Sequence, residues 1–183
     1  FRDYYDPHIK EGNIAGFILH PNFTLIREDI CLMNSFPDVD YVFHLAAQAG
    51  VRASWGSSFD QYTHDNITAT QRLLEWFKDK KQLKKFVYSS SSSVYGNAPV
   101  YPVNEDVIPQ PVSPYGVSKL AGEHLYHLYH VNYGLPVVSL RYFTVYGPRQ
   151  RPDMAILKFF QRIISGNPIE MYGDGMQTRD FTY

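Results

Sequence analysis

The sequence is poor in cysteine, net charge and long hydrophobic runs, and each shortage narrows what the protein can be. Its 183 residues include one cysteine, Cys31, which excludes an intramolecular disulfide framework and fits a reducing compartment. No apolar run approaches the roughly 18 residues of a membrane span, and the N-terminus has no signal-peptide pattern. The net charge of −1 gives no reason to expect nucleic acid as a partner. We therefore expect a cytoplasmic protein that binds no nucleic acid, with a membrane anchor upstream of Phe1 left open.

The composition is that of a globular chain, with 44% hydrophobic and 19% charged residues, and the length allows a substantial core. The chain opens on Phe1 rather than Met and stops at Tyr183 within a segment that looks extended. We interpret it as a piece of a longer protein. A truncated product with no function of its own is one alternative.

Strand-like and helix-like patterns alternate along the chain. Apolar runs typical of strands occur at 23–30, 41–47, 86–88 and 137–143. Helices are expected at 65–78 and at 114–132, the second with Ser113 as N-cap and Pro114 at its first position. This alternation predicts an α/β fold built on a doubly wound parallel sheet that is covered on both faces.

The first βαβ unit of such a sheet is missing. The fingerprint Gly-x-Gly-x-x-Gly occurs nowhere, and about 30 more residues ahead of Phe1 would be needed to supply that unit. Residues 1–150 are therefore interpreted as a partial Rossmann-like, dinucleotide-binding domain. A further helix is expected at 154–165, and residues 151–183 are interpreted as the start of a smaller substrate-binding region.

The spacing of Tyr115 and Lys119 is the main chemical signal. Four residues apart on a predicted helix, they share one face. A serine run, residues 89–93, ends the strand ahead of them, and ligands bind where the strands of such sheets end. A neighbouring ammonium lowers the pKa of a phenol from its usual value near 10. Tyr115 is thus a candidate general base for a substrate alcohol, although an isolated Tyr-x-x-x-Lys pair is weak evidence.

The order of the motifs resembles that of the extended short-chain dehydrogenase/reductases of the NAD-dependent epimerase/dehydratase family, which act on nucleotide sugars. The resemblance covers the whole chain. It rests on Asp29-Ile30 after a strand, His44-Leu-Ala-Ala47, Asn66 at a helix start, the serine run with Val94-Tyr95-Gly96, the Tyr115/Lys119 pair and the segment 141–148. It implies NAD as the cofactor and a UDP-sugar as the substrate.

The resemblance also implies roles for individual residues. Tyr115 is the catalytic base, Lys119 lowers its pKa and holds the nicotinamide ribose, and Ser91 bonds the sugar hydroxyl. Residues expected along the cofactor are Asp29, Ile30, Leu45, Ala46, Ala47, Asn66, Tyr142 and Phe143, in addition to Tyr115 and Lys119. Residues expected along the substrate are Arg52, Ser92, Ser93, Thr144, Arg151 and Arg179. No metal is implied, and a homodimer is expected through the helices near 65–78 and 114–132.

The two residues after Ser91 limit which reaction of the family is expected. Relatives that dehydrate or decarboxylate the sugar carry acidic residues there, whereas this chain has Ser92 and Ser93. The resemblance therefore favours a 4-epimerase, which oxidises C4, lets the 4-keto sugar rotate and returns the hydride. Segments 91–96 and 144–154 most resemble UDP-glucuronate 4-epimerases, which give UDP-galacturonate. Oxidation at C4 of a uronate creates a β-keto acid prone to lose CO2, so a firm grip on the carboxylate is expected.

Other interpretations stay open. A UDP-glucose-type 4-epimerase would not need the carboxylate grip, and a non-catalytic protein of the same fold would bind only a dinucleotide or a partner. The serine run also fits a plain polar loop, Thr144 a strand-end hydroxyl, and Asn66 a helix cap. His124, His127 and His130 spread over about 120° of helix surface, which favours a solvated or interface stripe over a metal site.

Overall fold

The computed structural model describes residues 1–176 and 178–183 and divides the chain into two compact units. One unit is Glu28–Tyr142. The other combines Phe1–Arg27 with Phe143–Tyr183. The expected boundary near residue 150 stays a prediction.

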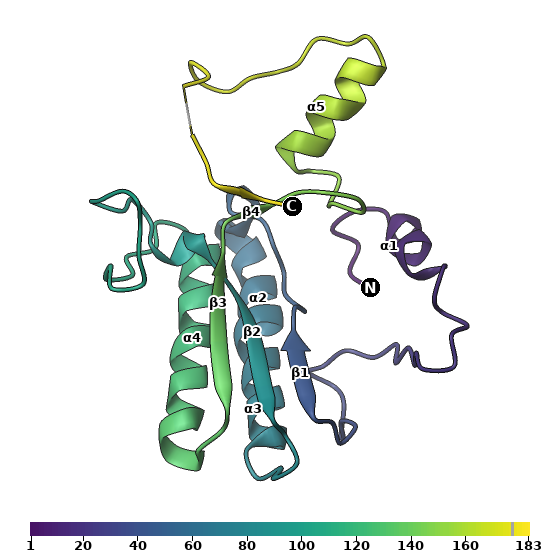
Figure 1. The fold of residues 1–183 in the computed structure, drawn as a ribbon, viewed down its shortest axis with the longest axis vertical. Helices are drawn as coiled ribbons and strands as arrows, with labels where there is room; N and C mark the ends of the chain where they lie inside the picture. The colour runs from purple at the N-terminus through teal and green to yellow at the C-terminus, as the bar shows by residue number, and fades with distance from the viewer. Residues whose placement is uncertain (177) are drawn as a thin grey trace. The chain divides into compact units, whose positions relative to one another are not determined.

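The unit Glu28–Tyr142 is built on a parallel three-stranded sheet (Figure 1). Its strands are β1 (Tyr41–His44), β2 (Lys85–Ser91) and β3 (Val137–Tyr142), in the order β1-β2-β3. The register sets Ser90 opposite Arg141 and Ser91 opposite Tyr142. Because all strands run the same way, the residues that follow β1 and β2 meet at one edge of the sheet. The parallel α/β fold is as predicted.

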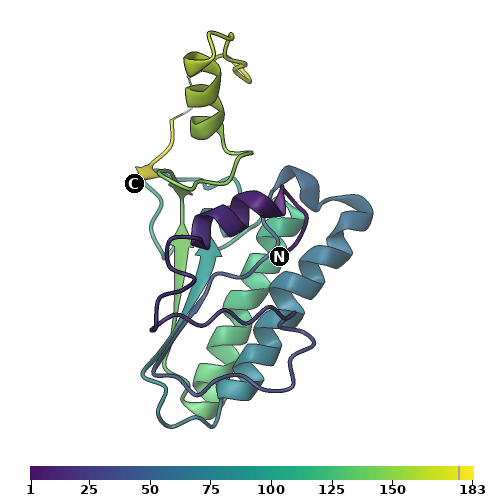
Figure 2. The same ribbon diagram turned by 90° about the vertical axis from the view of Figure 1, so that its right-hand side faces the viewer.

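Two long helical segments pack on one face of this sheet (Figure 2). The first runs through α2 (Phe59–Tyr62), the π-helix η3 (Thr63–Thr68) and α3 (Ala69–Phe77), and the second is α4 (Pro114–Tyr133). Short 3₁₀ turns lie at Arg52–Ser54, Gly56–Ser58 and Ser92–Val94, the last called η4. Helix α4 matches its prediction: Ser113 accepts from the backbone N–H of Gly116, and Gly134 ends the helix in the left-handed conformation at φ 69°.

Two expectations about this fold were wrong. Residues 23–30 form no strand, because no described strand pairs with them, and an extended segment without a ladder partner is not stable as a strand. The first long helix begins at Phe59 rather than at 65. Within this unit the helices cover one face of the sheet (Figure 2), and apolar side chains of its strands such as Phe43 and Leu140 are exposed.

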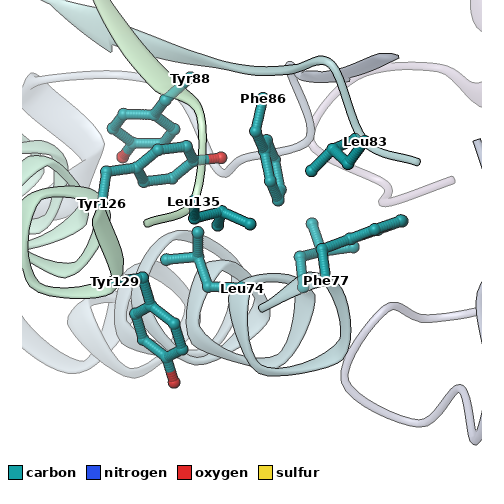
Figure 3. Close-up of a cluster of buried hydrophobic side chains, with 9 residues drawn as sticks. Leu74, Phe77, Leu83, Phe86, Tyr88, Tyr126, Tyr129 and Leu135 are labelled. Carbon is teal, nitrogen blue, oxygen red and sulfur yellow. The ribbon is translucent and has the colours of Figure 1, made fainter. Parts of the chain in front are cut away.

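The core lies between β2 and the two helices (Figure 3). It is formed by Leu73, Leu74, Phe77, Leu83, Phe86, Tyr88, Tyr126, Tyr129 and Leu135. The Tyr88 and Tyr126 rings stack at 4.7 Å, and Phe86 meets Tyr126 edge-on at 5.0 Å. Each such side chain contributes about 1.5–3 kcal/mol by burial. The aromatic residues Tyr126 and Tyr129 of α4 thus pack in the core.

The second unit holds α1 (Pro7–Ile14), β4 (Thr144–Val145), α5 (Ala155–Ile164) and β5 (Phe181–Thr182). Strands β4 and β5 pair in parallel, with Thr144 opposite Phe181. Helix α5 falls within its predicted range. No described helix has the length and apolarity needed to cross a membrane.

Candidate active site

The serine run is part of the secondary structure rather than a polar loop. Its first three residues finish β2, and the next two open the 3₁₀ turn η4. Ser91 caps that turn by accepting a hydrogen bond from the backbone N–H of Ser93 at 3.2 Å. The strand therefore delivers the Ser91 hydroxyl to the edge of the sheet, and Ser92 and Ser93 follow it there.

Helix α4 carries Tyr115 and Lys119 one turn apart. The Lys119 side chain is 4% exposed, and its Nζ donates to the carbonyl oxygen of Ser89 at 2.7 Å. Burial lowers the pKa of Lys119 to about 8. The amine is therefore still mainly protonated at pH 7, so a cation sits one turn from the Tyr115 phenol.

A glycine lets α4 approach the serine turn. A Cβ atom at Gly116 would lie 2.6 Å from the carbonyl oxygen of Ser93 and 2.9 Å from Pro111 Cβ. The first turn of α4 therefore lies directly against η4. This close approach brings the residue next to Gly116, Tyr115, to the part of the unit that holds Ser91.

Asn66 ties three segments of the site together and does not cap a helix. It lies within the π-helix η3, and its Oδ1 accepts from the backbone N–H of Gln48 at 2.7 Å. Its Nδ2 donates to the Gln48 carbonyl at 3.0 Å and to Ser118 Oγ at 2.8 Å, and Ser118 in turn donates to the Tyr115 carbonyl. π-Helical turns are frequent at functional sites. Asn66 therefore fixes the loop after β1 and the turn of α4 that carries Tyr115, and a direct cofactor contact stays a prediction.

The buried imidazole of His44 also senses the charge of Lys119. His44, 3% exposed, makes a 2.9 Å hydrogen bond through Nε2 to Thr70 Oγ1. The Thr70 hydroxyl donates to the Asn66 carbonyl, so its oxygen accepts from His44, which assigns the proton to Nε2. Burial and, secondarily, the charge of Lys119 lower the pKa of His44 to about 3. His44 is therefore neutral at physiological pH.

Six further residues expected along the cofactor lie at three places in the unit Glu28–Tyr142. Leu45, Ala46 and Ala47 follow β1, with Leu45 68% exposed. Asp29 accepts from the backbone N–H of Cys31 at 2.8 Å, and Ile30 packs against the core. Tyr142 ends β3 beside Ser91. Arg52, expected along the substrate, is exposed in the first 3₁₀ turn.

Four predicted site residues belong to the other unit. They are Phe143, Thr144, Arg151 and Arg179. Arg151 pairs with Asp153, with an Nη2–Oδ2 distance of 3.0 Å, and its guanidinium lies over the Tyr4 ring. Thr144 lies in β4, and Arg179 is exposed. Their roles toward a substrate stay predictions.

Metal-ligand residue types gather at one place among the described residues, and it is not the histidine stripe. Asp29, Cys31 and His64 bring ligand atoms within 4.8 Å of one another. Their side chains already make hydrogen bonds: Asp29 accepts from the backbone N–H of Cys31, Cys31 Sγ donates to the His64 carbonyl oxygen at 3.5 Å, and His64 Nδ1 bonds Asp65 at 2.7 Å. We assign no ion to this group. The three histidines of α4 are exposed, as the solvated-stripe interpretation predicted.

Sequence reasoning missed several residues that build the site. They are Gln48, Ser90, Gly116, Ser118 and Glu123. Gly116 and Ser118 had a visible signal, since small residues flanking Tyr115 indicate close packing of the helix. The others act through contacts with residues distant in the chain, and spacing alone does not reveal such contacts.

Comparison with known proteins identifies the class. The model of the NAD dependent epimerase/dehydratase family matches residues 20–183, and the chain belongs to this family, as predicted.

Among particular relatives, a UDP-glucuronate 4-epimerase of Thermodesulfobacterium geofontis is 42% identical, covering 99% of this chain and 57% of the relative. An uncharacterized UDP-glucose epimerase of Bacillus subtilis is 46% identical, covering 96% and 56%. A solved structure of UDP-glucuronic acid 4-epimerase from Bacillus cereus, in complex with UDP-glucuronic acid and NAD, is 52% identical with a TM-score of 0.92, covering 97% and 57%. The chain thus spans a little over half the length of these relatives.

Proposed function

We propose that this chain is the catalytic segment of an NAD-dependent nucleotide-sugar 4-epimerase that converts UDP-glucuronate to UDP-galacturonate. The observation that carries the proposal is the placement of Ser91, Tyr115 and Lys119, in a chain with serines directly after Ser91. The likeness to epimerases of UDP-glucuronate, one of them with a TM-score of 0.92, supports the substrate.

The site residues fit NAD. Lys119 uses one of its three N–H donors on Ser89, and it forms no ion pair in the described part of the chain. Its ammonium can therefore donate to a vicinal diol such as a ribose. Leu45 and Ala46 present exposed apolar surface directly after β1, which suits a flat cofactor at the sheet edge. Asp29 would hold the adenosine end of the cofactor, and Tyr142 would lie at its nicotinamide end.

The mechanism assigns each side chain one task. When bound, NAD supplies a hydride acceptor for C4 and later the hydride that returns to C4. Tyr115, as a phenolate beside the Lys119 cation, accepts the proton of the C4 hydroxyl, and Ser91 orients that hydroxyl by a hydrogen bond. The 4-keto sugar then rotates within the site, so that the hydride returns to the opposite face of C4. Tyr115 returns the proton to O4. Atoms and charge balance over the cycle, so no other reactant is consumed.

The two residues after Ser91 carry hydroxyl groups rather than carboxyl groups, which fits a reaction that stops at epimerisation. A dehydratase needs an acid to protonate its leaving group, whereas Ser92 and Ser93 offer only hydroxyls. Hydroxyl donors are suited to binding the uronate carboxylate, and Thr144 and Arg151 are proposed to assist. Loss of CO2 from the β-keto acid requires the C5–C6 bond to stand perpendicular to the plane of the C4 carbonyl, so donors that hold the carboxylate away from that orientation disfavour it.

A UDP-glucose epimerase is the second candidate, and one observation favours it. Arg151 is already paired with Asp153, so its charge is partly neutralised and is less available for a uronate. The name of the Bacillus subtilis relative points the same way.

Replacing Arg151 by alanine separates the two candidates. With the complete polypeptide, we expect Arg151→Ala to raise KM for UDP-glucuronate about tenfold and to leave UDP-glucose kinetics nearly unchanged, because only the uronate carries a carboxylate. Steady-state kinetics with both sugars measures this. An equal loss on both sugars would mean that Arg151 serves only its pair with Asp153, and the uronate grip would have to be abandoned.

The same proposal includes a homodimer formed through α3 and α4. The two helices lie side by side in Figure 2, and α4 has exposed apolar residues, among them Leu128 and Val131. Burial of such residues against a second copy would remove apolar surface from water.

A further inference from the structure

A shielded ion pair joins α4 to β3. Glu123 lies four residues after Lys119 and eight after Tyr115, so all three share one face of α4. Arg141 of β3 donates to its carboxylate in a two-pronged contact, with Nε–Oε1 at 3.0 Å and Nη2–Oε2 at 2.8 Å. The Arg141 and Glu123 side chains are 20% and 11% exposed. Charge-assisted, bidentate bonds of this kind fix geometry as well as adding energy.

The same carboxylate reaches β2. Ser90 Oγ donates to Glu123 Oε1, and Ser90 directly precedes Ser91. Ser90 also sits opposite Arg141 in the register of the sheet. Glu123 therefore closes a ring of contacts among α4, β2 and β3 at the end of the strand that delivers Ser91.

Arg141 also contacts the residue that follows the serine turn. Its guanidinium carbon lies 4.8 Å from the centroid of the Tyr95 ring, within cation–π range. Tyr95 is buried and directly follows η4, the turn that contains Ser92 and Ser93. Arg141 is therefore in contact with both the helix and the turn.

We propose that Glu123 and Arg141 are positioning residues that set the separation between the Ser91 hydroxyl and the Tyr115 phenol. The proposal rests on the proposed epimerase function. Ser91 ends β2 and Tyr115 lies on α4. Glu123 joins α4 to β2 through Ser90 and to β3 through Arg141. The pair acts through geometry, because its charges are already satisfied by each other and by Ser90.

Kinetics of the complete polypeptide test this proposal. A displacement of about 1 Å can cost on the order of 10²-fold in rate, so Glu123→Ala should lower kcat by about 10- to 100-fold. KM should change by no more than about twofold, because the substrate contacts remain. Glu123→Gln, which keeps an oxygen acceptor for Ser90, should lose less.

Lys84→Gln is the matched control, since Lys84 forms an exposed ion pair with Asp40 at 2.9 Å. It should keep wild-type kinetics. A purely structural role of Glu123 predicts a lower Tm with an unchanged kcat per folded molecule, and that result would overturn the proposal.

Failure of the positioning role can be told apart from failure of the function. If the wild-type polypeptide were inactive, the epimerase function would be refuted. The positioning role would then be tested by hydrogen–deuterium exchange instead of kinetics. Glu123→Ala should then speed exchange in residues 88–96 and 113–120 but not in α3. Unchanged exchange in both segments would refute the positioning role.

Discussion

We expect Tyr115→Phe to lower kcat for UDP-glucuronate by about 10³-fold in the complete polypeptide, because a general base contributes roughly 10²–10⁴-fold and no described side chain duplicates its position. The phenol is the group on α4 that can accept the C4 proton beside the Lys119 cation. Phenylalanine keeps the ring that meets Tyr62 edge-on at 6.2 Å, so the fold should be retained. The effect is measured by quenching the reaction at set times and separating UDP-glucuronate from UDP-galacturonate.

A second variant identifies the contribution of the cation. Lys119→Met removes the ammonium but keeps a long side chain for the buried position, and its pH–rate profile should shift to higher pH because the phenolate is no longer stabilised. Circular dichroism confirms that both variants are folded. If Tyr115→Phe retained more than about a tenth of the wild-type kcat, Tyr115 would not be the base.

We expect the protein to lose stability in mild acid because of His44. The pKa of His44 is about 3 in the folded state and about 6.5 in an unfolded chain. Below pH 6.5 the unfolded state therefore binds a proton that the folded state does not, so stability is fully present above pH 6.5 and falls as the pH drops toward 3. The loss between pH 7 and pH 4 amounts to roughly 3 kcal/mol.

The variant His44→Gln should remove this part of the pH dependence. Glutamine retains an N–H donor for Thr70 and does not titrate. Tm measured from pH 4 to pH 8 should fall less steeply in His44→Gln than in wild type. The exposed His127 of α4 provides the control, and His127→Gln should follow the wild-type curve. Identical slopes for wild type and His44→Gln would show that His44 is not the buried acid-sensitive group.

Local signals predicted α4 well, because its ends are set by neighbouring residues. Ser113 caps the start, Pro114 fits the first position, and Gly134 ends the helix. Residues 23–30 were not predictable in the same way, since a strand exists only with a partner strand. The π-helical turn in the first long helix was likewise not predictable from neighbouring residues, because Asn66 within it bonds Gln48 and Ser118, which lie 18 and 52 residues away.

In the site, too, some residues could be predicted from the nearby sequence, whereas others depend on contacts with residues distant in the chain. Tyr115 and Lys119 were recognisable by their spacing, and Ser91 by its place at the end of a strand. The contacts of Glu123 with Ser90 and Arg141 span 33 and 18 residues, and they depend on the register of β2 against β3. Spacing along one helix predicts which residues share a face, but not what that face meets.

Proton NMR of UDP-glucuronate incubated with NAD and the complete polypeptide containing this segment tests the central claim most directly. The account predicts signals of UDP-galacturonate, with all carbon atoms of the sugar retained, approaching an equilibrium mixture with the substrate. Unchanged UDP-glucuronate with a folded protein would contradict the uronate assignment, and a decarboxylated product would contradict epimerisation itself.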